Sequence, residues 1–444
     1  MDFTKGNIGR SIFVFSVPII LGNLFQQLYS LVNSIFVGKY LGVEELAAVG
    51  STYPVVFFIT SMVLGIGSGG SVAVSHYYGA KDYESIHKII STFYIFFILL
   101  GLVICIFGIV SADCIFAMLG LNQQVRTMAV EYFRIYMAGM FFSVIFHSAV
   151  SILRGLGDSV TQLWFLIPAN ILNIVLSYLF LGVMNLGIEA SAFASLISQF
   201  CAFAALFIFL GRKHEFVKLP SIKNLFFSRV YLRQIVSIGV PTGLQQSIVS
   251  LTQILILFLV TSFGTDAIAG YSAAVRVESI ALIFVLNIAQ ALTSFTGTNL
   301  GAGLSERSKQ GLKTSIKLMG IVALVTLIIF CFGSRWLIGL FTTEQAVIEI
   351  GSQYLVVDGL FWFLFGVMMT FTAYFRGAGY AFVTLVISFI TLWLARFPIS
   401  WYLSSLMGVK GIWLGAPLAW LLSIIIYLIY YKKKNISNSK IVKS

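Results

Sequence analysis

Long apolar runs recur along the whole chain and are separated by short polar segments. A helix that crosses the hydrocarbon core of a bilayer needs about 20 mostly apolar residues. The runs therefore predict twelve membrane-spanning helices, at residues 11–37, 47–74, 89–112, 131–153, 162–183, 189–211, 233–261, 268–298, 316–336, 352–375, 381–404 and 410–431. No polar segment is long enough for a soluble domain, so the expected fold class is an all-α membrane protein.

The composition is also that of a membrane protein. Of the 444 residues, 59% are hydrophobic and 10% are charged, and the mean hydropathy is +0.97. Soluble domains average about 45–50% apolar and about 25% charged residues. The lipid bilayer is therefore the expected solvent of most of the surface.

The two halves of the chain repeat each other. The segment RGLGD at 154–158 returns as RGAGY at 376–380, a displacement of 222 residues. Three further pairs keep this displacement: LGVEELAA (41–48) with FGTDAIAG (263–270), Gly79-Ala80 with Gly301-Ala302, and Tyr132 with Tyr354. Each repeat holds six spans, an even number, so both halves enter the membrane in the same direction. Such a parallel repeat is typical of transporters.

The repeat divides the chain into four expected segments. They are an N-terminal six-helix lobe (1–211), a cytoplasmic linker (212–232), a C-terminal six-helix lobe (233–431) and a basic cytoplasmic tail (432–444). The linker is basic, contains Pro220 and has no apolar run long enough to span a bilayer.

The distribution of basic residues predicts the orientation. With the N-terminus inside, 21 of the 28 lysines and arginines fall in segments on that side, four fall in the opposite loops and three fall inside spans. Both termini are therefore expected to be cytoplasmic, in a multi-pass protein of the plasma membrane. The net charge of +12 arises from these loops and does not indicate a nucleic-acid partner.

Polar residues inside two of the predicted spans form stripes. The first span has Asn23, Gln26, Ser30 and Asn33, and the seventh has Gln246, Ser250 and Gln253. Steps of three and four residues place each set on one face of its helix. Because polar side chains avoid hydrocarbon, we expect both stripes to face a substrate cavity between the halves. The alternative is that the amides join helices through packing hydrogen bonds worth about 0.6–2 kcal/mol each.

Four charged residues inside spans are further candidates. Glu278 and Asp358 are acids at positions where a charge costs at least about 2.5–3.5 kcal/mol, and they are the candidates for binding a coupling cation. Arg276 and Arg396 are candidate cavity residues, and Arg396 is a candidate counter-charge for either acid. The alternative is a buried ion pair with a structural role.

No pattern of catalytic, metal or nucleotide chemistry accompanies these residues. The four histidines lack helical metal-ligand spacing, and the sixteen acids are too sparse for a membrane enzyme. No GxxxxGK[ST] segment is present to bind ATP phosphates. We therefore expect no enzymatic activity, no metal site, no cofactor and no obligatory protein partner. The energy for moving a small-molecule substrate is expected to come from a gradient of Na+ or H+.

Several motifs resemble those of the multidrug and toxic compound extrusion (MATE) family, in the multidrug/oligosaccharidyl-lipid/polysaccharide flippase superfamily. They are PIILGNLFQQLYSLVNSIFVG (18–38), LAAVG (46–50), HYYGAKD (76–82), RGLGD (154–158), RVES (276–279) and GTNLGAG (297–303). The resemblance covers nearly the whole chain. It implies two six-helix lobes around a central cavity, and export of amphipathic, often cationic compounds in exchange for sodium ions or protons.

One position departs from the pattern of the family. Many bacterial members have an aspartate in a first-span segment like LYxLVD, where this chain reads LYSLVN and therefore has Asn33. An amide does not titrate, so the resemblance does not carry proton coupling to this position. Asn33 could ligate sodium through its carbonyl oxygen, or coupling could rest on Glu278 or Asp358.

Two other transport functions fit a fold of six plus six helices. A flippase for a lipid-linked oligosaccharide shares the superfamily's fold, but a diphosphate needs a more strongly cationic cavity than Arg276 and Arg396 provide. A major-facilitator-type transporter would carry a GxxxDRxGRR-like loop after the second span, where this chain reads GAKDYESIHK. Multidrug antiport is therefore the preferred hypothesis.

Overall fold

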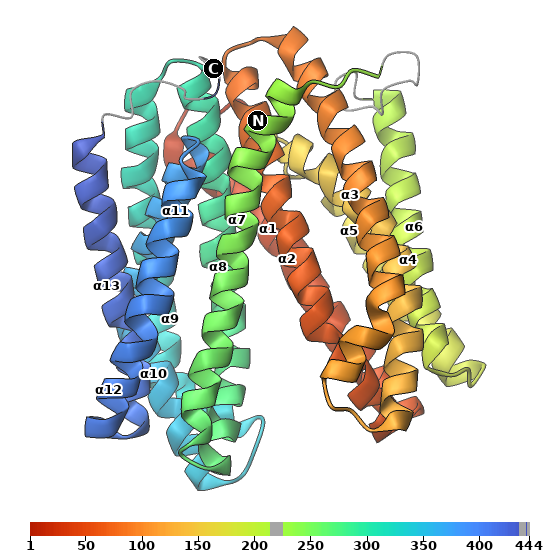
Figure 1. Cartoon of the computed structure of the whole chain (residues 1–444). Coiled ribbons are helices and arrows are strands. Elements are labelled where there is room, and N and C mark those ends of the chain that lie inside the picture. The colour runs from red at the N-terminus through yellow and green to blue at the C-terminus, as the bar shows by residue number, and fades with distance from the viewer. Residues whose placement is uncertain (214–224, 435–440, 442–444) are drawn as a thin grey trace. The chain divides into compact units, whose positions relative to one another are not determined.

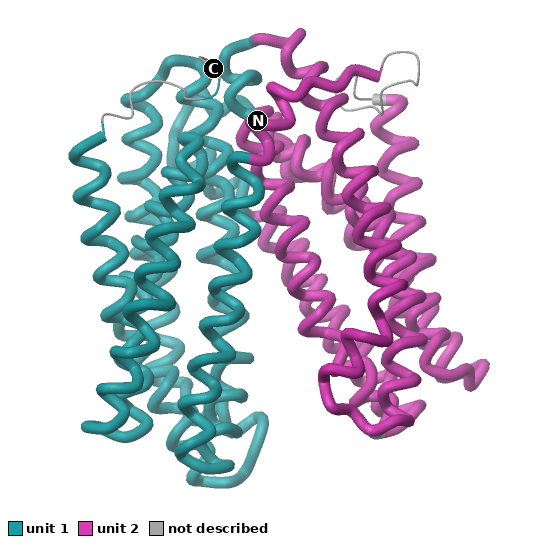
Figure 2. Tube along the Cα trace, in the orientation of Figure 1, with its two compact units in different colours: residues 1–16, 75–81, 237–444 teal, residues 17–74, 82–236 magenta. Residues whose placement is uncertain are grey.

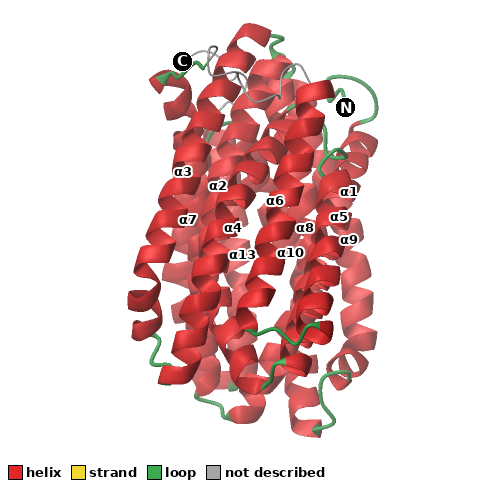
Figure 3. Ribbon diagram, turned by 90° about the vertical axis from the view of Figure 1, so that its right-hand side faces the viewer, coloured by secondary structure: helices red, strands yellow, loops and turns green. Residues whose placement is uncertain are grey.

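The computed structural model describes residues 1–213, 225–434 and 441. Within these residues all regular structure is helical, and there is no strand (Figure 3). Twelve spans in this part of the chain are long and apolar enough to cross a membrane. The predicted fold class, an all-α membrane protein of twelve spans, is confirmed.

Two π-helical segments interrupt the α-helices. In chain order the elements are α1 (Ile8–Tyr40), α2 (Val43–Gly79), α3 (Tyr83–Met118), α4 (Gln123–Gly155), α5 (Leu163–Ser177), η1 (Tyr178–Val183), α6 (Ile188–Lys213), α7 (Arg229–Thr261), α8 (Thr265–Gly301), α9 (Ser305–Gly339), α10 (Gln345–Gly377), α11 (Ala381–Ser388), η3 (Phe389–Arg396), α12 (Phe397–Met407) and α13 (Val409–Lys433). The fifth span joins α5 to η1, and the eleventh joins α11, η3 and α12.

Most helices extend beyond the apolar runs that predicted them. The largest difference is in α9, which begins at Ser305, whereas the apolar run begins at residue 316. The added turns are polar, and an ion pair of 2.7 Å joins Lys309 to Glu306 on their surface. Backbone hydrogen bonding continues past the edge of the apolar run, so the run predicts the span and not the ends of the helix.

The described chain forms two compact units, coloured separately in Figure 2. Unit 1 contains residues 1–16, 75–81 and 237–444, and unit 2 contains residues 17–74 and 82–236. Within unit 1, α10 packs against α8, α9 and α13, and within unit 2, α4 packs against α3 and α6. In unit 1 the loops that follow α7, α9 and α12 lie at the end opposite to the start of α1 (Figure 1). Three helices, α1, α2 and α7, contribute residues to both units.

The predicted linker and tail are described only in part. Residues 214–224, 435–440 and 442–444 lie outside the described residues. At the described end of the linker, the backbone N–H of Phe226 donates to Ser91 Oγ at 2.9 Å, which holds this segment on α3. The division of the chain into two lobes, a linker and a tail stays a prediction.

The glycines of the repeated RGLGD and RGAGY segments bring equivalent helices into close contact. A Cβ atom added at Gly155 would lie 2.7 Å from the carbonyl oxygen of Ser71, and one added at Gly377 would lie 2.5 Å from that of Thr293. Ser71 and Thr293 are themselves 222 residues apart. The same contact, α2 with α4 in unit 2 and α8 with α10 in unit 1, therefore explains why the motif occurs twice.

A second close contact joins the end of α2 to the end of α8 within unit 1. A Cβ atom at Gly79 would overlap the carbonyl oxygen of Thr298, and one at Gly301 would overlap that of His76. The buried His76 also donates from Nε2 to the carbonyl oxygen of Gly377 at 2.7 Å. Because a carbonyl oxygen only accepts, Nε2 carries the proton.

The segment before α1 is also tied to unit 1, and we call residues 1–7 the N-terminal strap. Phe3 is 1% exposed, and its ring packs against Phe15 and Phe295 at centroid distances of 5.1 and 5.6 Å. The amide of Asn299 on α8 donates to the carbonyl oxygen of Phe3 at 3.2 Å. A single aromatic side chain thus anchors a polar segment.

Arg307 on α9 holds the strap through its backbone. Its Nε donates to the carbonyl oxygen of Phe3 at 3.0 Å, and its Nη2 donates to those of Lys5 and Gly6 at 2.7 and 2.9 Å. Hydrogen bonds from a charged donor contribute about 1.5–3 kcal/mol each. Arg307 is therefore the main polar attachment of the strap.

We predict that Gly301→Ala lowers the stability of the folded protein. The added methyl group would meet the carbonyl oxygen of His76, and overpacking of this kind costs about 1–3 kcal/mol. Gly339→Ala is the matched control, because nothing lies within 4 Å of a Cβ atom at that position. Thermal unfolding of the detergent-solubilised variants should show a lower midpoint for Gly301→Ala only. Equal midpoints for the two variants would contradict the close contact.

We also predict that Arg307→Gln releases the N-terminal strap. The shorter amide cannot reach the three carbonyl oxygens that the guanidinium contacts. Lys309→Gln is the control, since Lys309 makes an exposed ion pair with Glu306 on the same helix. Limited proteolysis should cleave near the N-terminus faster in Arg307→Gln than in the wild type or in Lys309→Gln. Unchanged cleavage would show that Arg307 does not hold the strap.

Candidate functional site

Two acids of unit 1 lie close to each other on neighbouring helices. Glu278 on α8 accepts a hydrogen bond of 2.6 Å from the hydroxyl group of Tyr354 on α10. Asp358, one turn further along α10 and therefore on the same face as Tyr354, is 5% exposed. The charge of Glu278 acts on Asp358. The structure thus brings together the two acids that the sequence selected separately.

Arg396 completes what we call the carboxylate cluster (Glu278, Tyr354, Asp358 and Arg396). It is the last residue of η3, and its positive charge acts on both acids. Arg396 is nevertheless absent from the ion pairs found among the described residues. Its buried Nε atom and the buried Oδ2 atom of Asp358 also have no hydrogen-bond partner in the described part of the chain.

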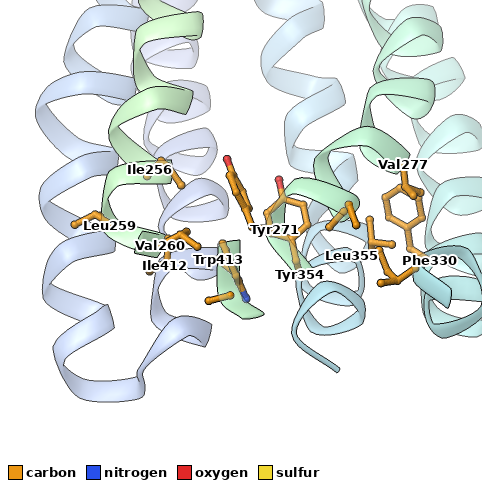
Figure 4. Packing of buried hydrophobic residues seen from close by; sticks show 14 residues of the cluster. Ile256, Leu259, Val260, Tyr271, Val277, Phe330, Tyr354, Leu355, Ile412 and Trp413 are labelled. Carbon is orange, nitrogen blue, oxygen red and sulfur yellow. The ribbon is translucent and has the colours of Figure 1, made fainter. Parts of the chain in front are cut away.

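The aromatic rings of Tyr271, Tyr354 and Trp413 pack together in the core of unit 1 (Figure 4). Tyr271 stacks on Trp413 with ring planes 8° apart, and Tyr354 stands at 90° to Trp413 with centroids 4.9 Å apart. The hydroxyl groups of both tyrosines point to the same side in Figure 4. These ring contacts fix the position of Tyr354, whose hydroxyl group donates to Glu278.

Among the described residues the cluster combines two acids with one guanidinium. Two ionised carboxylates repel each other strongly away from bulk water, and a single guanidinium compensates only one of them. The unpartnered Oδ2 of Asp358 provides a free acceptor. A sodium ion prefers such oxygen ligands, and a proton removes one of the two charges.

Asn33 lies in a separate, uncharged group of side chains in unit 2. It is 9% exposed, and its Oδ1 atom accepts hydrogen bonds from Ser177 at 3.3 Å and Ser191 at 3.4 Å. Ser177 belongs to α5 and Ser191 to α6. The carbonyl oxygen that would ligate sodium therefore already accepts two hydroxyl donors.

The hydrogen bonds around Asn33 extend further into unit 2. Ser177 Oγ lies 3.2 Å from Asn173 Oδ1, and Asn173 Nδ2 donates to Ser195 Oγ at 3.2 Å. Tyr29 of α1 lies 3.5 Å from the same serine oxygen. We call Asn33, Asn173, Ser177, Ser191 and Ser195 the amide network. All its members are neutral, whereas the carboxylate cluster has charged members.

The polar stripes on α1 and α7 differ in exposure. Their exposed members are Gln26, Ser30, Gln246 and Gln253, and their half-buried members are Asn23 and Ser250. Ser250 Oγ donates to the carbonyl oxygen of Gln246 at 3.1 Å, a contact within its own helix. Arg276 is exposed, and its charge is not among those that act on Glu278 or Asp358 in the described chain.

Several contributing residues were not selected from the sequence. They are Tyr271, Tyr354 and Trp413 beside the acids, and Asn173, Ser177, Ser191 and Ser195 beside Asn33. Tyr354 precedes Asp358 by four residues, and the pairs Asn173–Ser177 and Ser191–Ser195 have the same spacing. Each pair therefore lies on one face of its helix. This four-residue spacing of polar side chains was the signal by which the sequence could have indicated these residues. No comparable spacing indicates Trp413.

Among the described residues, no group of three or more histidines, cysteines, aspartates or glutamates could hold a metal ion. Glu278 and Asp358 are two carboxylates, and the further polar group that contacts Glu278 is the hydroxyl group of Tyr354.

Curated relatives match the chain over nearly its full length. A protein of Bacillus subtilis (strain 168) named "Probable multidrug resistance protein YoeA" is 31% identical over 98% of this chain and 96% of the relative. "Multidrug export protein MepA" of Staphylococcus aureus (strain MRSA252) is 24% identical over 92% of this chain and 90% of its own length.

Solved structures share the fold. One described as an "Outward-facing conformation of a multidrug resistance MATE family transporter of the MOP superfamily" superposes with a TM-score of 0.90 at 27% identity, covering 100% of this chain and 98% of that chain. The family model MatE matches the chain twice, at residues 18–179 and 241–402, once in each repeat. These matches confirm the resemblance seen in the motifs, and the chain belongs to the MatE (MATE) family of membrane transporters.

Proposed function

We propose that this protein is a secondary-active multidrug exporter that moves amphipathic, often cationic, small molecules in exchange for Na+ or H+. The names of the relatives YoeA and MepA support multidrug export. The observation that carries the exchange is the carboxylate cluster, in which the buried Asp358 and the half-buried Glu278 share one guanidinium. We place the protein in the plasma membrane with both termini cytoplasmic, following the distribution of basic residues.

The proposed coupling is an equilibrium between two charge states of the cluster. A cation bound at Glu278 and Asp358 neutralises the excess negative charge and stabilises the conformation in which the acids lie close together. Loss of the cation leaves a repulsive pair and favours another conformation. Exchange follows if the substrate binds better to the state without the cation, since coupling between two ligands is reciprocal.

We propose that the polar stripes of α1 and α7 line the path of the substrate. Exposed amides such as Gln26 and Gln246 cannot face hydrocarbon without a large loss of hydration. A water-filled path satisfies them. Side-chain amides and aromatic groups can bind many amphipathic compounds, which suits a substrate range defined by shape and charge.

The alternative of a lipid-linked oligosaccharide flippase is less well supported. The substrate of such a protein carries a diphosphate, whereas the described cluster has two acids against Arg396. A negatively charged site repels a diphosphate and attracts cations.

We predict that Asp358→Asn and Glu278→Gln each reduce cation-driven efflux by at least about tenfold, within the range of typical coupling energies. Glu349→Gln is the control, because Glu349 is an exposed acid on α10 that pairs with Arg335. Efflux of a fluorescent organic cation from proteoliposomes, under sodium and pH gradients imposed separately, measures the effect. Wild-type rates in both acid variants would exclude the proposed site, and no wild-type efflux under either gradient would exclude the proposed function.

We predict that Asn33→Ala changes stability and not coupling. The substitution removes the acceptor of the Ser191 hydroxyl group and one of the two acceptors of the Ser177 hydroxyl group, at about 1–2 kcal/mol. The thermal midpoint should therefore fall, while the cation concentration for half-maximal efflux stays that of the wild type. A shift of tenfold in that concentration would place coupling at Asn33 instead.

A further inference from the structure

The carboxylate cluster contains a donor and an acceptor that are both unsatisfied. Arg396 Nε and Asp358 Oδ2 are buried and have no hydrogen-bond partner among the described residues, although the two groups act on each other electrostatically. Leaving a charged donor and a charged acceptor apart in a low-dielectric interior is unfavourable. A pair formed between this guanidinium and this carboxylate would satisfy both atoms.

The acids differ in how firmly they are already bound. Glu278 receives the Tyr354 hydroxyl at 2.6 Å, and the position of that tyrosine is set by its perpendicular contact with Trp413. Asp358 has one oxygen, Oδ2, that accepts no hydrogen bond from the described part of the chain. A mobile positive group would therefore pair with Asp358 first, because no existing hydrogen bond has to break.

Arg396 stands where the backbone departs from regular α-helix. It ends η3, and α12 follows it at once with Pro398 in its first turn. Proline is well tolerated in the first turn of a helix, and π-helical turns are often found at functional sites. The long, flexible side chain of an arginine at this position can gain a partner by changing rotamer, without unfolding of the helix.

The charged and titratable groups around this site come from three elements. Tyr271 and Glu278 face it from α8, Tyr354 and Asp358 from α10, and Arg396 from η3. Within the described chain Arg396 is the positive charge that acts on both acids. With one guanidinium against two carboxylates, one further monovalent charge balances the cluster.

We propose that Arg396 is a tethered counter-cation that pairs with Asp358 when the coupling cation leaves and withdraws when that cation binds. The inference rests on the proposed cation coupling at Glu278 and Asp358. Arg396 then keeps the emptied acids from repelling each other, so the transporter can complete its cycle, and it competes with the coupling cation for the same carboxylate. It is a positioning residue for the exchange and not a ligand of the substrate.

Arg396→Gln and Arg396→Lys test this role with the cation that drives the wild type. Removing the competing charge in Arg396→Gln should lower the cation concentration for half-maximal efflux by about tenfold or more. The maximal rate at saturating cation should fall by a similar factor, because the emptied acids lack a replacement charge. Arg396→Lys retains the charge and should recover most of that rate. Arg335→Gln, which removes an exposed arginine of unit 1, should behave as the wild type.

The outcomes separate this inference from the proposed function. If Arg396→Gln changes neither parameter, or reaches the full wild-type rate at saturating cation, Arg396 is not a replacement cation. That result leaves the proposed function intact as long as wild-type efflux depends on the cation and Asp358→Asn abolishes this dependence. Folding of each variant is checked by its thermal midpoint, and Arg396→Lys carries the test if Arg396→Gln does not fold. The role is also overturned if Arg396→Lys folds but its maximal efflux rate is no higher than that of Arg396→Gln.

Discussion

A charged side chain inside a bilayer has no water to solvate it, so every such group needs a partner supplied by the protein or by an ion. Glu278 and Asp358 meet this constraint only in part, through one tyrosine hydroxyl and one nearby guanidinium. In our proposal, the remaining negative charge makes the cluster responsive to a cation. The aromatic packing of Tyr271, Tyr354 and Trp413 matters because it holds the hydrogen bond between Tyr354 and Glu278 in place.

The two repeats share a framework and differ in chemistry. Glycine contacts at Gly155 and Gly377 place equivalent helices together in each unit. On that framework, unit 2 has an amide network around Asn33 and unit 1 has a pair of carboxylates. The repeat therefore supplies the architecture twice, and in our proposal only the C-terminal copy supplies a site that can change charge.

The sequence predicted the spans because the thickness of the hydrocarbon core demands apolar runs of one length. It also selected Glu278, Asp358 and Arg396, since charges stand out in such runs. It could not predict that the Tyr354 hydroxyl meets Glu278, because that contact joins residues 76 positions apart and depends on how α8 packs against α10. The π-helical turn before Arg396 and the burial of Phe3 likewise have no periodic signal, since each depends on tertiary contacts.

The central claim is that cation and substrate movements are linked at the carboxylate cluster. The most direct test loads proteoliposomes with substrate, imposes no cation gradient, and measures the flow of sodium and of protons while the substrate leaves. The account predicts that one of the two cations flows against the substrate in the wild type and that this flow is absent in Asp358→Asn. Substrate movement without any opposing cation flow in the wild type, or an undiminished flow in Asp358→Asn, would contradict it.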